Sequence, residues 1–273
     1  MADNGSPAKR SLAKRFWNRN DAHAPAPVPA QADDVQRLAP WMYEFDLNGT
    51  KTPLLAESLR AIHTARRSMM FELLDGFGFD PSASVLDLAC SEGYFSFEFA
   101  KRGAREVVGI DARERNIEKA QLVRERQGLS ACRFVVDDVT TCPLAPHAFD
   151  VVLLLGIIYH VEDPIRLMRR AAAAAGRILF VETQLSKPHA PIGFGWGTPE
   201  PAYSSHTWAM VRENPGVDDL SATRGFSLIP SASAVVSVLR DIGFRSILQL
   251  HPNDRANEAQ YDSVDRALFA ALW

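Results

Sequence analysis

The sequence predicts an α/β fold in which a parallel sheet is covered by helices on both faces. The main observation is an alternation: short apolar runs and helix-period runs follow one another, roughly every 20 to 30 residues, from residue 85 to residue 182. The second is composition, with 47% hydrophobic and 23% charged residues in a chain of 273. These values are typical of a globular domain and exclude a disordered or fibrous chain.

Each predicted element follows from its own pattern. Apolar runs predict strands at residues 85–88, 106–110, 133–136, 149–155, 177–182, 244–250 and 267–272. Helical spacing predicts helices at residues 57–77, 94–101, 113–127, 163–175 and 231–242. In the first helix the apolar stripe is followed by Gly76, which we interpret as its C-cap.

The first part of the chain differs in composition from the rest. Residues 1–20 carry five Lys or Arg residues against Asp3 alone, and an Ala/Pro-rich run follows. We expect residues 1–33 to form a disordered tail or linker, although a basic tail could also contact an acidic surface. One domain is expected over residues 34–273, ordered from near Pro40, with Asn48-Gly49 as the turn of a short hairpin or strap.

The cysteines, the length of the apolar runs and the net charge limit the class of protein that we expect. Cys90, Cys132 and Cys142 lack the number and spacing of a disulfide framework or a zinc site, so we expect a cytoplasmic protein without a metal. No apolar run reaches the roughly 20 residues that span a bilayer, and we expect neither a secretory signal nor a membrane segment. Outside the tail the chain is net acidic, which offers no general attraction to nucleic acid.

Residues 185–230 interrupt the alternation. This stretch is rich in proline, glycine and aromatic residues and lacks clear periodicity. Long irregular segments inside compact domains are usually functional, so we expect a lid over the substrate. Four of its residues are candidates for acceptor binding, with a local hydrophobic core as the alternative role: Trp196, Tyr203, His206 and Trp208.

The segment "VLDLACSEGYF" is the most informative motif. An apolar strand ends in Asp87 and leads through small residues to Gly93 and a helix. Small side chains let a ligand approach the backbone, and the helix start offers unpaired amide groups. We therefore expect a nucleotide-type cradle, and its candidate residues are Asp87, Ala89, Cys90, Ser91, Gly93 and Tyr94.

Two further carboxylates follow the next two strands. Asp111, followed by Ala112, ends "VVGIDA", where an acid accepts hydrogen bonds from ribose hydroxyls. Asp138 follows the third strand and could accept from an exocyclic amine, while Val139 could pack on an adenine face. Alternatively, a strand-end Asp only caps the next helix.

With these motifs, residues 57–273 resemble the class I S-adenosylmethionine-dependent methyltransferases. The resemblance implies that Asp87 and its loop hold the methionine part of S-adenosylmethionine, Asp111 the ribose and Asp138 the adenine. It also implies a Rossmann-like sheet of seven strands in the order 3-2-1-4-5-7-6, with strand 7 antiparallel. A nicotinamide-dependent oxidoreductase is the rival class. The broken glycine fingerprint opposes it, and so does the lack of a tyrosine with lysine four residues later.

The fourth strand leads into "GIIYHVEDP", which places Tyr159 and His160 at the carboxyl end of the sheet. We predict His160 as the base or as a donor that positions the acceptor, with Tyr159 beside it. The alternative is that His160 only packs against or caps the following helix. Glu182 is a further residue that could reach the acceptor.

A narrower resemblance involves "YHVEDP" together with residues 224–244. These segments are similar to the tRNA wobble-uridine carboxymethyltransferase group, which implies a carboxylated cofactor and a tRNA substrate. The approach to the first strand, "AIHTARRSMMFELL", departs from that group. We therefore predict methyl transfer to an oxygen or nitrogen of a small molecule. The alternatives are tRNA modification and a non-catalytic module that binds S-adenosylmethionine.

Overall fold

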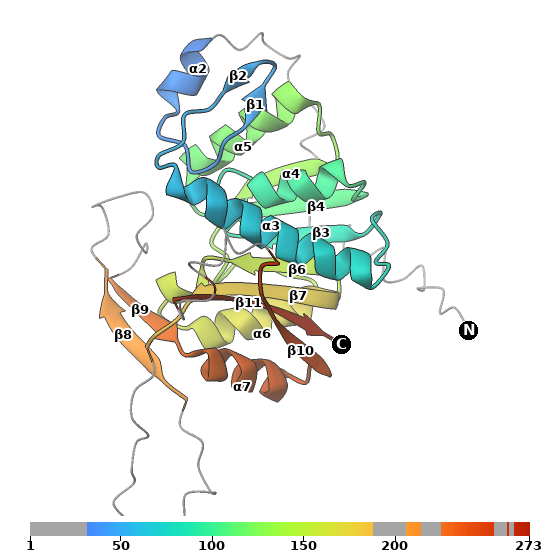
Figure 1. The fold of residues 1–273 in the computed structure, drawn as a ribbon, viewed down its shortest axis with the longest axis vertical. Coiled ribbons are helices and arrows are strands. Elements are labelled where there is room, and N and C mark those ends of the chain that lie inside the picture. The colour runs from blue at the N-terminus through green and yellow to red at the C-terminus, as the bar shows by residue number, and fades with distance from the viewer. Residues whose placement is uncertain (1–31, 188–205, 214–224, 254–260, 262–264) are drawn as a thin grey trace, which may run out of the picture.

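The computed structural model describes residues 32–187, 206–213, 225–253, 261 and 265–273, and all structural statements below refer to these residues. Its centre is a seven-stranded sheet (Figure 1). The strands are β3 (Ser84–Leu88), β4 (Glu106–Asp111), β5 (Cys132–Val136), β6 (Phe149–Leu155), β7 (Ala175–Gln184), β10 (Ser246–Leu250) and β11 (Arg266–Leu272).

The order of the strands across the sheet is β5-β4-β3-β6-β7-β11-β10. The first five run parallel, whereas β11 is antiparallel to both of its neighbours. Counted along the chain, this is the order 3-2-1-4-5-7-6 with strand 7 antiparallel, so the predicted topology is confirmed. The bounds of the strands agree with the expected ones to within two residues.

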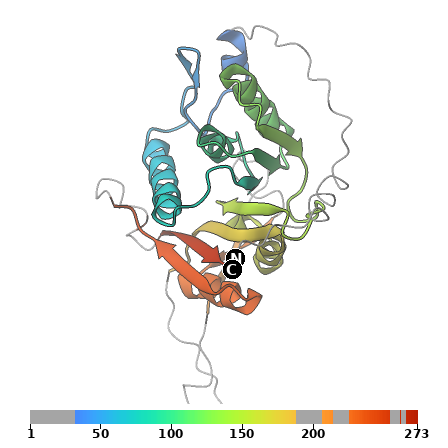
Figure 2. The same cartoon turned by 90° about the vertical axis from the view of Figure 1, so that its right-hand side faces the viewer.

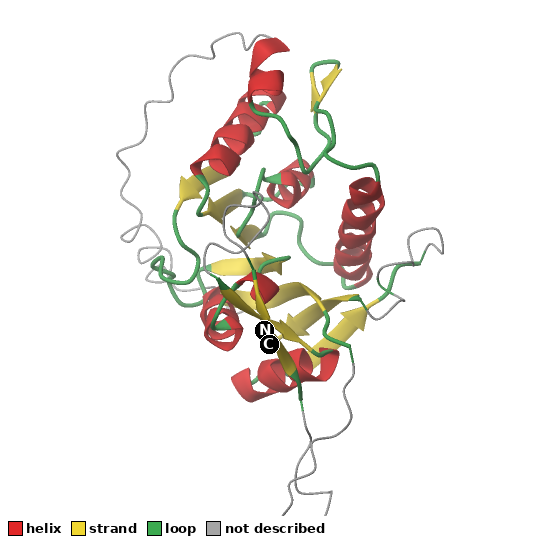
Figure 3. Cartoon of the chain, turned by 90° about the vertical axis from the view of Figure 1, so that its left-hand side faces the viewer, coloured by secondary structure: helices red, strands yellow, loops and turns green. Residues whose placement is uncertain are grey.

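Helices cover both faces of the sheet (Figure 2 and Figure 3). On one face, Met70, Phe97 and Ile117 of three helices meet Val85 and Phe180 of the sheet in one buried cluster. Those helices are α3 (Ser58–Gly76), α4 (Tyr94–Lys101) and α5 (Glu114–Gln127). Two helices cover the opposite face, α6 (Pro164–Ala174) and α7 (Ala232–Ile242). The predicted coverage of both faces is therefore confirmed.

The end of α3 differs from the prediction. Gly76 is still helical, and the left-handed residue is Gly78, at φ 58°. The Gly78 amide donates to the Asp75 carbonyl, and the Phe79 amide donates to the Leu74 carbonyl. Gly76 as the C-cap was therefore wrong, because a second glycine two residues later takes the left-handed conformation that ends the helix.

A segment that we call the N-terminal strap, residues 38–52, precedes α3. It contains the predicted hairpin, with β1 (Asp46–Leu47) paired to β2 (Thr50–Lys51). Asn48 and Gly49 are both left-handed, at φ 57° and 91°, as a two-residue hairpin turn requires. Helix α2 (Ala32–Arg37) comes before the strap, so regular structure begins earlier than Pro40, where it was expected. The tail over residues 1–31 lies outside the described residues.

The insert after β7 is described in part. It contains β8 (Trp208–Arg212) and β9 (Phe226–Pro230), which pair as an antiparallel ribbon, a regularity that the sequence pattern did not reveal. The ribbon packs through β9 against the short 3-10 helix η2 (Ile158–His160). Residues 188–205 and 214–224 of the expected lid lie outside the described residues.

The carboxyl ends of the parallel strands meet at one edge of the sheet. Leu88 pairs with Ile110, and Asp111 pairs with Val136, so the loops after β3, β4 and β5 are neighbours. None of the described helices combines the length and the apolar character that crossing a membrane requires.

Candidate cofactor and acceptor site

The loop after β3 has an unusual backbone. Three of its residues, Ala89, Ser91 and Gly93, adopt left-handed φ angles of 61°, 51° and 81°. A side chain disfavours this conformation, by about 1–2 kcal/mol per residue, and the penalty is tolerated where the surrounding structure fixes the loop. Small residues were predicted here because they let a ligand approach the backbone. The structure adds a second reason, since Ala89 and Ser91 occupy left-handed positions that favour glycine.

Close packing explains two glycines at the site. A β-carbon on Gly93 would lie 2.7 Å from the Phe134 ring, and one on Gly109 would lie 2.6 Å from the same ring. Cys90 points toward Gly109 as well, so its sulfur packs in the core and its backbone remains in the loop. Phe134 thereby fixes how closely β4 and the loop approach each other.

Asp87 is 2% exposed and accepts a hydrogen bond from the Ser96 hydroxyl at 2.7 Å. Burial raises the pKa of its carboxyl to about 7, because a charge away from water is disfavoured. The residue predicted to hold an amino-acid group thus carries a carboxyl that titrates near neutrality.

Asp111 is buried at the end of β4 and joins two loops. Its Oδ2 accepts from the Ser91 amide at 2.9 Å, and its Oδ1 accepts from the Arg113 amide and from Asn116 Nδ2. It therefore caps the start of α5, as the alternative interpretation held. One lone-pair direction on Oδ2 is left for a ligand, so capping does not exclude the predicted ribose contact.

Asp138 lies at the corresponding place after β5. Its Oδ1 accepts from the amide and hydroxyl of Thr140, while Val139 beside it is buried in the cluster under α6. Asp138 and His160 line one cavity of about 280 Å³, together with residues at the start of α6. The structure thus brings a predicted adenine contact and the predicted base to a shared cavity.

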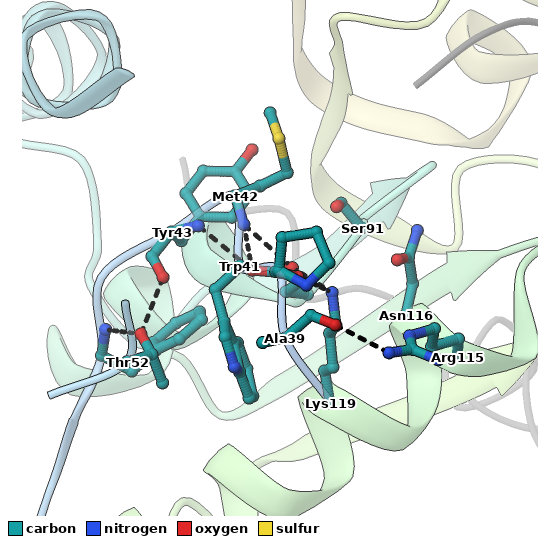
Figure 4. A network of polar contacts seen from close by, with 12 residues as sticks. Ala39, Trp41, Met42, Tyr43, Thr52, Ser91, Arg115, Asn116 and Lys119 are labelled. Atoms are coloured by element: carbon teal, nitrogen blue, oxygen red, sulfur yellow. Dashed lines mark hydrogen bonds and ion pairs between the residues drawn. The ribbon is translucent and has the colours of Figure 1, made fainter. Parts of the chain in front are cut away.

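The N-terminal strap crosses the site and is fixed there by Glu92. The Glu92 carboxylate is fully buried and accepts from the amides of Met42 and Tyr43 at 3.0–3.1 Å. Lys119 of α5 donates to the same carboxylate at 2.7 Å and to the Pro40 carbonyl (Figure 4). Glu92 could not be recognised from the sequence, since the Met42 and Tyr43 amides are 50 and 49 residues away along the chain and Lys119 is 27 residues away.

Aromatic side chains also pack between the N-terminal strap and the helices α3 and α4. Tyr94, a predicted cofactor residue at the start of α4, stacks on Tyr43 with ring centroids 4.9 Å apart. His63 of α3 packs against both rings, with its centroid 4.0 Å from that of Tyr43 and 5.9 Å from that of Tyr94. Burial, aided by Arg66, lowers the pKa of His63 to about 3, so this imidazole is neutral at physiological pH. Ala112, in contrast, is exposed after β4.

His160 has a carboxylate partner on the insert. Its Nδ1 lies 2.9 Å and 3.0 Å from the two oxygens of Glu213, which follows β8. The Ser227 hydroxyl of β9 donates to Glu213 Oε1 at 2.8 Å. Helix α6 is capped by Asp163, whose side chain accepts from the Arg166 amide, so capping is not the role of His160. Burial lowers the pKa of His160 although Glu213 acts to raise it.

A buried charged cluster lies at the ends of β6 and β7, and most of it was not predicted. Glu182 is fully buried, and its Oε1 accepts from Arg66 at 3.0 Å, Arg266 at 2.8 Å and Tyr261 at 3.3 Å. Arg266 also donates to the hydroxyl of Tyr159, a predicted site residue, at 3.1 Å. One signal was available, since Arg66 falls on the apolar stripe of α3 between Ala65 and Met69.

Of the four candidate acceptor-binding residues in the insert, two lie within the described residues. Trp208 of β8 is half-buried and packs against the cluster under α6 and α7, which fits a local core, and His206 is exposed just before it. Trp196 and Tyr203 lie outside the described residues. Among the residues that the structure describes, no group of three or more His, Cys, Asp or Glu side chains could hold a metal ion.

Comparison with known proteins agrees with this geometry. A family model described as "Methyltransferase domain" matches residues 79–188. A tRNA U34 carboxymethyltransferase of Desulfotalea psychrophila is 28% identical over 162 residues, 59% of this chain and 44% of that protein. A ubiquinone biosynthesis O-methyltransferase of Neisseria meningitidis serogroup C is 31% identical over 107 residues, 38% of this chain and 44% of that protein. The chain therefore spans less than half the length of either relative.

Solved structures share the fold. The N-terminal domain of EvdMO1, crystallised with S-adenosylhomocysteine and D-fucose, superposes with a TM-score of 0.64 at 21% identity, covering 88% of this chain and 93% of that one. Magnesium protoporphyrin IX methyltransferase from Synechocystis PCC 6803 superposes with a TM-score of 0.54 at 16% identity, covering 96% and 99%. The sheet thus has the strand order of the class I S-adenosylmethionine-dependent methyltransferase fold, and residues 79–188 match a methyltransferase domain.

Proposed function

We propose that this protein transfers the methyl group of S-adenosylmethionine to an oxygen or nitrogen atom of a small molecule. The observation that carries the proposal is that Asp87, Asp111 and Asp138 follow one another along one edge of the sheet. The left-handed loop from Ala89 to Gly93 lies at the same edge. This arrangement fits a ligand with an amino-acid part, a ribose and a base in that order.

The cofactor would be held by groups that have hydrogen-bonding capacity left. Asp111 Oδ2 accepts one hydrogen bond from Ser91 and has room for a ribose hydroxyl. Asp138 uses Oδ1 for Thr140, which leaves Oδ2 for the adenine amine. Asp87 and the amides at the start of α4 would hold the methionine part. When bound, S-adenosylmethionine supplies a methyl group on a positively charged sulfur.

This orientation also places the acceptor. With the adenosine along β4 and β5, the sulfur end lies at β3, and the next strands in the opposite direction are β6 and β7. Tyr159 and His160 follow β6: His160 lines the cavity that it shares with Asp138, and Tyr159 shares Arg266 with Glu182 of β7. The acceptor would therefore bind there, covered by the insert and by the N-terminal strap.

We assign the proton transfer to His160. Because Nδ1 donates to Glu213, the lone pair lies on Nε2. The lowered pKa of His160 keeps the imidazole neutral at physiological pH, as a base requires. As the acceptor atom bonds to the methyl carbon and the carbon–sulfur bond breaks, His160 Nε2 would take the proton that the acceptor loses.

The second candidate function is modification of tRNA. The relatives named tRNA U34 carboxymethyltransferase favour it, whereas the net acidic body of the chain opposes it. A tRNA enzyme would bind tRNA with a steep dependence on salt, because phosphate contacts release counterions. Binding that is absent, or flat across ionic strength, would exclude this candidate.

The proposed function is tested by calorimetry and mass spectrometry on the purified chain. We expect S-adenosylhomocysteine to bind with one-to-one stoichiometry, and any cofactor that co-purifies to have the mass of ordinary S-adenosylmethionine. Failure of both S-adenosylmethionine and S-adenosylhomocysteine to bind would contradict the proposal. A co-purified carboxylated form would transfer support to the tRNA candidate.

A further inference from the structure

We propose that Arg66, Tyr159 and Glu182 form a binding site beside Gly156 for a neutral hydroxyl or amide group of the methyl acceptor. We call it the Gly156 site. It holds a second polar group of the acceptor, in addition to the atom that is methylated. The inference rests on the proposed function, because the acceptor is defined by it.

The geometry centres on Gly156, the residue after β6. Around the position that a β-carbon on Gly156 would take, Tyr159 Oη lies at 3.6 Å, Glu182 Oε2 at 3.7 Å and Arg66 Nη1 at 3.9 Å. These atoms come from η2, β7 and α3, three separate elements of the fold. Because residue 156 is glycine, the space between the three polar atoms is not filled by a side chain.

Glu182 is the residue that indicates a ligand. Its carboxylate is fully buried, and Arg66, Arg266 and Tyr261 all donate to the same oxygen, Oε1. Its other oxygen, Oε2, has no hydrogen-bond partner among the described residues. A buried carboxylate oxygen without a donor costs stability, so an unpaired one is expected where a ligand supplies the donor.

The other two groups define the chemistry that fits. Arg66 donates from Nε to Tyr261 and from Nη2 to Glu182, so Nη1 is the donor nearest Gly156. Tyr159 Oη accepts from Arg266, so its own hydrogen is available for donation. The Gly156 site therefore offers one acceptor and two donors. A hydroxyl or a primary amide satisfies both kinds, since it donates to Oε2 and accepts from Nη1 or Oη.

A carboxylate fits the Gly156 site poorly. It has no hydrogen to give to Oε2 and would bring a second negative charge next to Glu182. The two arginines are already bonded to Glu182, so their charge is partly neutralised within the cluster. We therefore expect the site to prefer a neutral group to a carboxylate of the same size.

The position of the Gly156 site matches the acceptor side. Leu154 of β6 pairs with Leu88 of β3, so Gly156, two residues further, lies level with Cys90 in the loop after β3. Adjacent strands are about 4.8 Å apart. Both chain neighbours of Asp87, and the residue before Glu182, belong to the cluster under α6 and α7. Because successive side chains of a strand point to opposite faces, the side chains of Asp87 and Glu182 point to the face covered by α3. The site is therefore next to the loop and on the side away from Asp111 and Asp138.

The experiment fills the site with one methyl group. In Gly156→Ala the new carbon would have ordinary contact distances of 3.6–3.9 Å, although the residue has φ +72°. The matched control is Gly128→Ala, at φ +66° with nothing within 4 Å of the new carbon. Both variants carry similar backbone strain, and only one occupies the Gly156 site. Thermal unfolding checks that both fold.

Three probes on the same ring are added to full-length protein saturated with S-adenosylhomocysteine: phenol, benzamide and benzoate. Saturation-transfer NMR measures their binding, and calorimetry measures the affinity for S-adenosylhomocysteine. We expect phenol or benzamide to bind at least fivefold more tightly than benzoate. That binding should fall at least fivefold in Gly156→Ala and stay unchanged in Gly128→Ala, with cofactor affinity within twofold throughout.

Three results would overturn the inference while leaving the proposed function intact. They are a preference for benzoate, an absence of phenol and benzamide binding to the wild type, or equal binding to Gly156→Ala. A tenfold loss of S-adenosylhomocysteine affinity in Gly156→Ala would also overturn it, since the site would then belong to the cofactor. If Gly156→Ala does not fold, Tyr159→Phe replaces it, with at least threefold weaker phenol binding expected and an unchanged affinity overturning the inference.

Discussion

The amide of Ser91 donates a hydrogen bond to Asp111 Oδ2 at 2.9 Å, which ties the loop after β3 to the end of β4. The same carboxylate caps α5 through the Arg113 amide and Asn116. Asp111 therefore shapes the proposed cofactor site before any ligand binds, and one lone-pair direction on Oδ2 remains for a ribose hydroxyl.

Replacing Asp111 by Ala should weaken binding of S-adenosylhomocysteine by about 1–3 kcal/mol, the cost of an unpaired polar partner. In calorimetry this is a loss of about 5- to 150-fold. Asp80→Ala is the control, since Asp80 also accepts two hydrogen bonds in a turn but is exposed and lies before β3. An unchanged affinity in a folded Asp111→Ala variant would remove the ribose assignment.

Ala89→Gly should leave the free energy of unfolding unchanged or raise it by up to about 1 kcal/mol. Relief of the left-handed strain, about 1–2 kcal/mol, outweighs the extra flexibility that glycine brings to the unfolded chain. Ala89→Val should lower the free energy of unfolding, because β-branched residues fit this conformation worst. Urea denaturation measures both, and a clear loss of stability in Ala89→Gly would contradict the strain argument.

Lys119→Met should destabilise the protein by about 3–5 kcal/mol, the scale for breaking a buried ion pair. Lys119 and Glu92 are 5% and 1% exposed at their side chains, and Glu92 would be left without its cation. The amides of Met42 and Tyr43 should then exchange hydrogen faster than in the wild type. Lys101→Met is the control, since the Lys101 side chain is 45% exposed and its pair with Glu98 is worth under about 1 kcal/mol. Equal effects of the two variants would contradict the role assigned to Glu92.

Asp87 should make stability fall as pH rises from about 4 to about 7. Its pKa is raised from 3.8 to about 7 in the folded chain, so the native state binds more protons than the unfolded state in that window. The cost of ionising it in the fold is fully present above pH 7 and amounts to roughly 4 kcal/mol. Asp87→Asn should therefore gain stability relative to the wild type between pH 4 and pH 8. A difference between the two that does not vary with pH would contradict the shift.

Glu213→Gln should move the pKa of His160 further down, because the Glu213 carboxylate acts to raise it. Nitrogen-15 NMR of the imidazole checks both the pKa and the tautomer, with the hydrogen expected on Nδ1. The acid limb of any methyl transfer rate should shift to lower pH. Asp241→Asn, which removes an exposed partner of Arg169 and does not act on the pKa of His160, is the control. A hydrogen on Nε2 in the wild type would exclude the proposed base.

The sheet and the loop after β3 could be predicted because their signals are local. Apolar runs and small loop residues are features of neighbouring positions, and "VLDLACSEGYF" contains the whole loop, although its left-handed angles were found only in the structure. Glu92 could not be recognised in the same way. It follows Ser91 like an ordinary loop residue, and only the folded chain brings the Met42 and Tyr43 amides to it.

The charged cluster illustrates the same limit. Glu182 could be named as a residue near the acceptor, since it ends a strand next to β6. Its partners Arg66 and Arg266 are separated from it by 116 and 84 residues, and no periodic pattern connects them. The ribbon of β8 and β9 was missed for another reason. Its strands are short and flank a long intervening segment, so neither alternation nor a two-residue turn marks them.

The central claim is that the ends of β3, β4 and β5 hold S-adenosylmethionine through its amino acid, ribose and base. A crystal structure of the full chain with S-adenosylhomocysteine tests it most directly. We expect the ribose within hydrogen-bonding distance of Asp111, the adenine amine at Asp138 and the sulfur facing Gly156. A ligand bound at another edge of the sheet, or with its adenine at β6 and β7, would contradict the account.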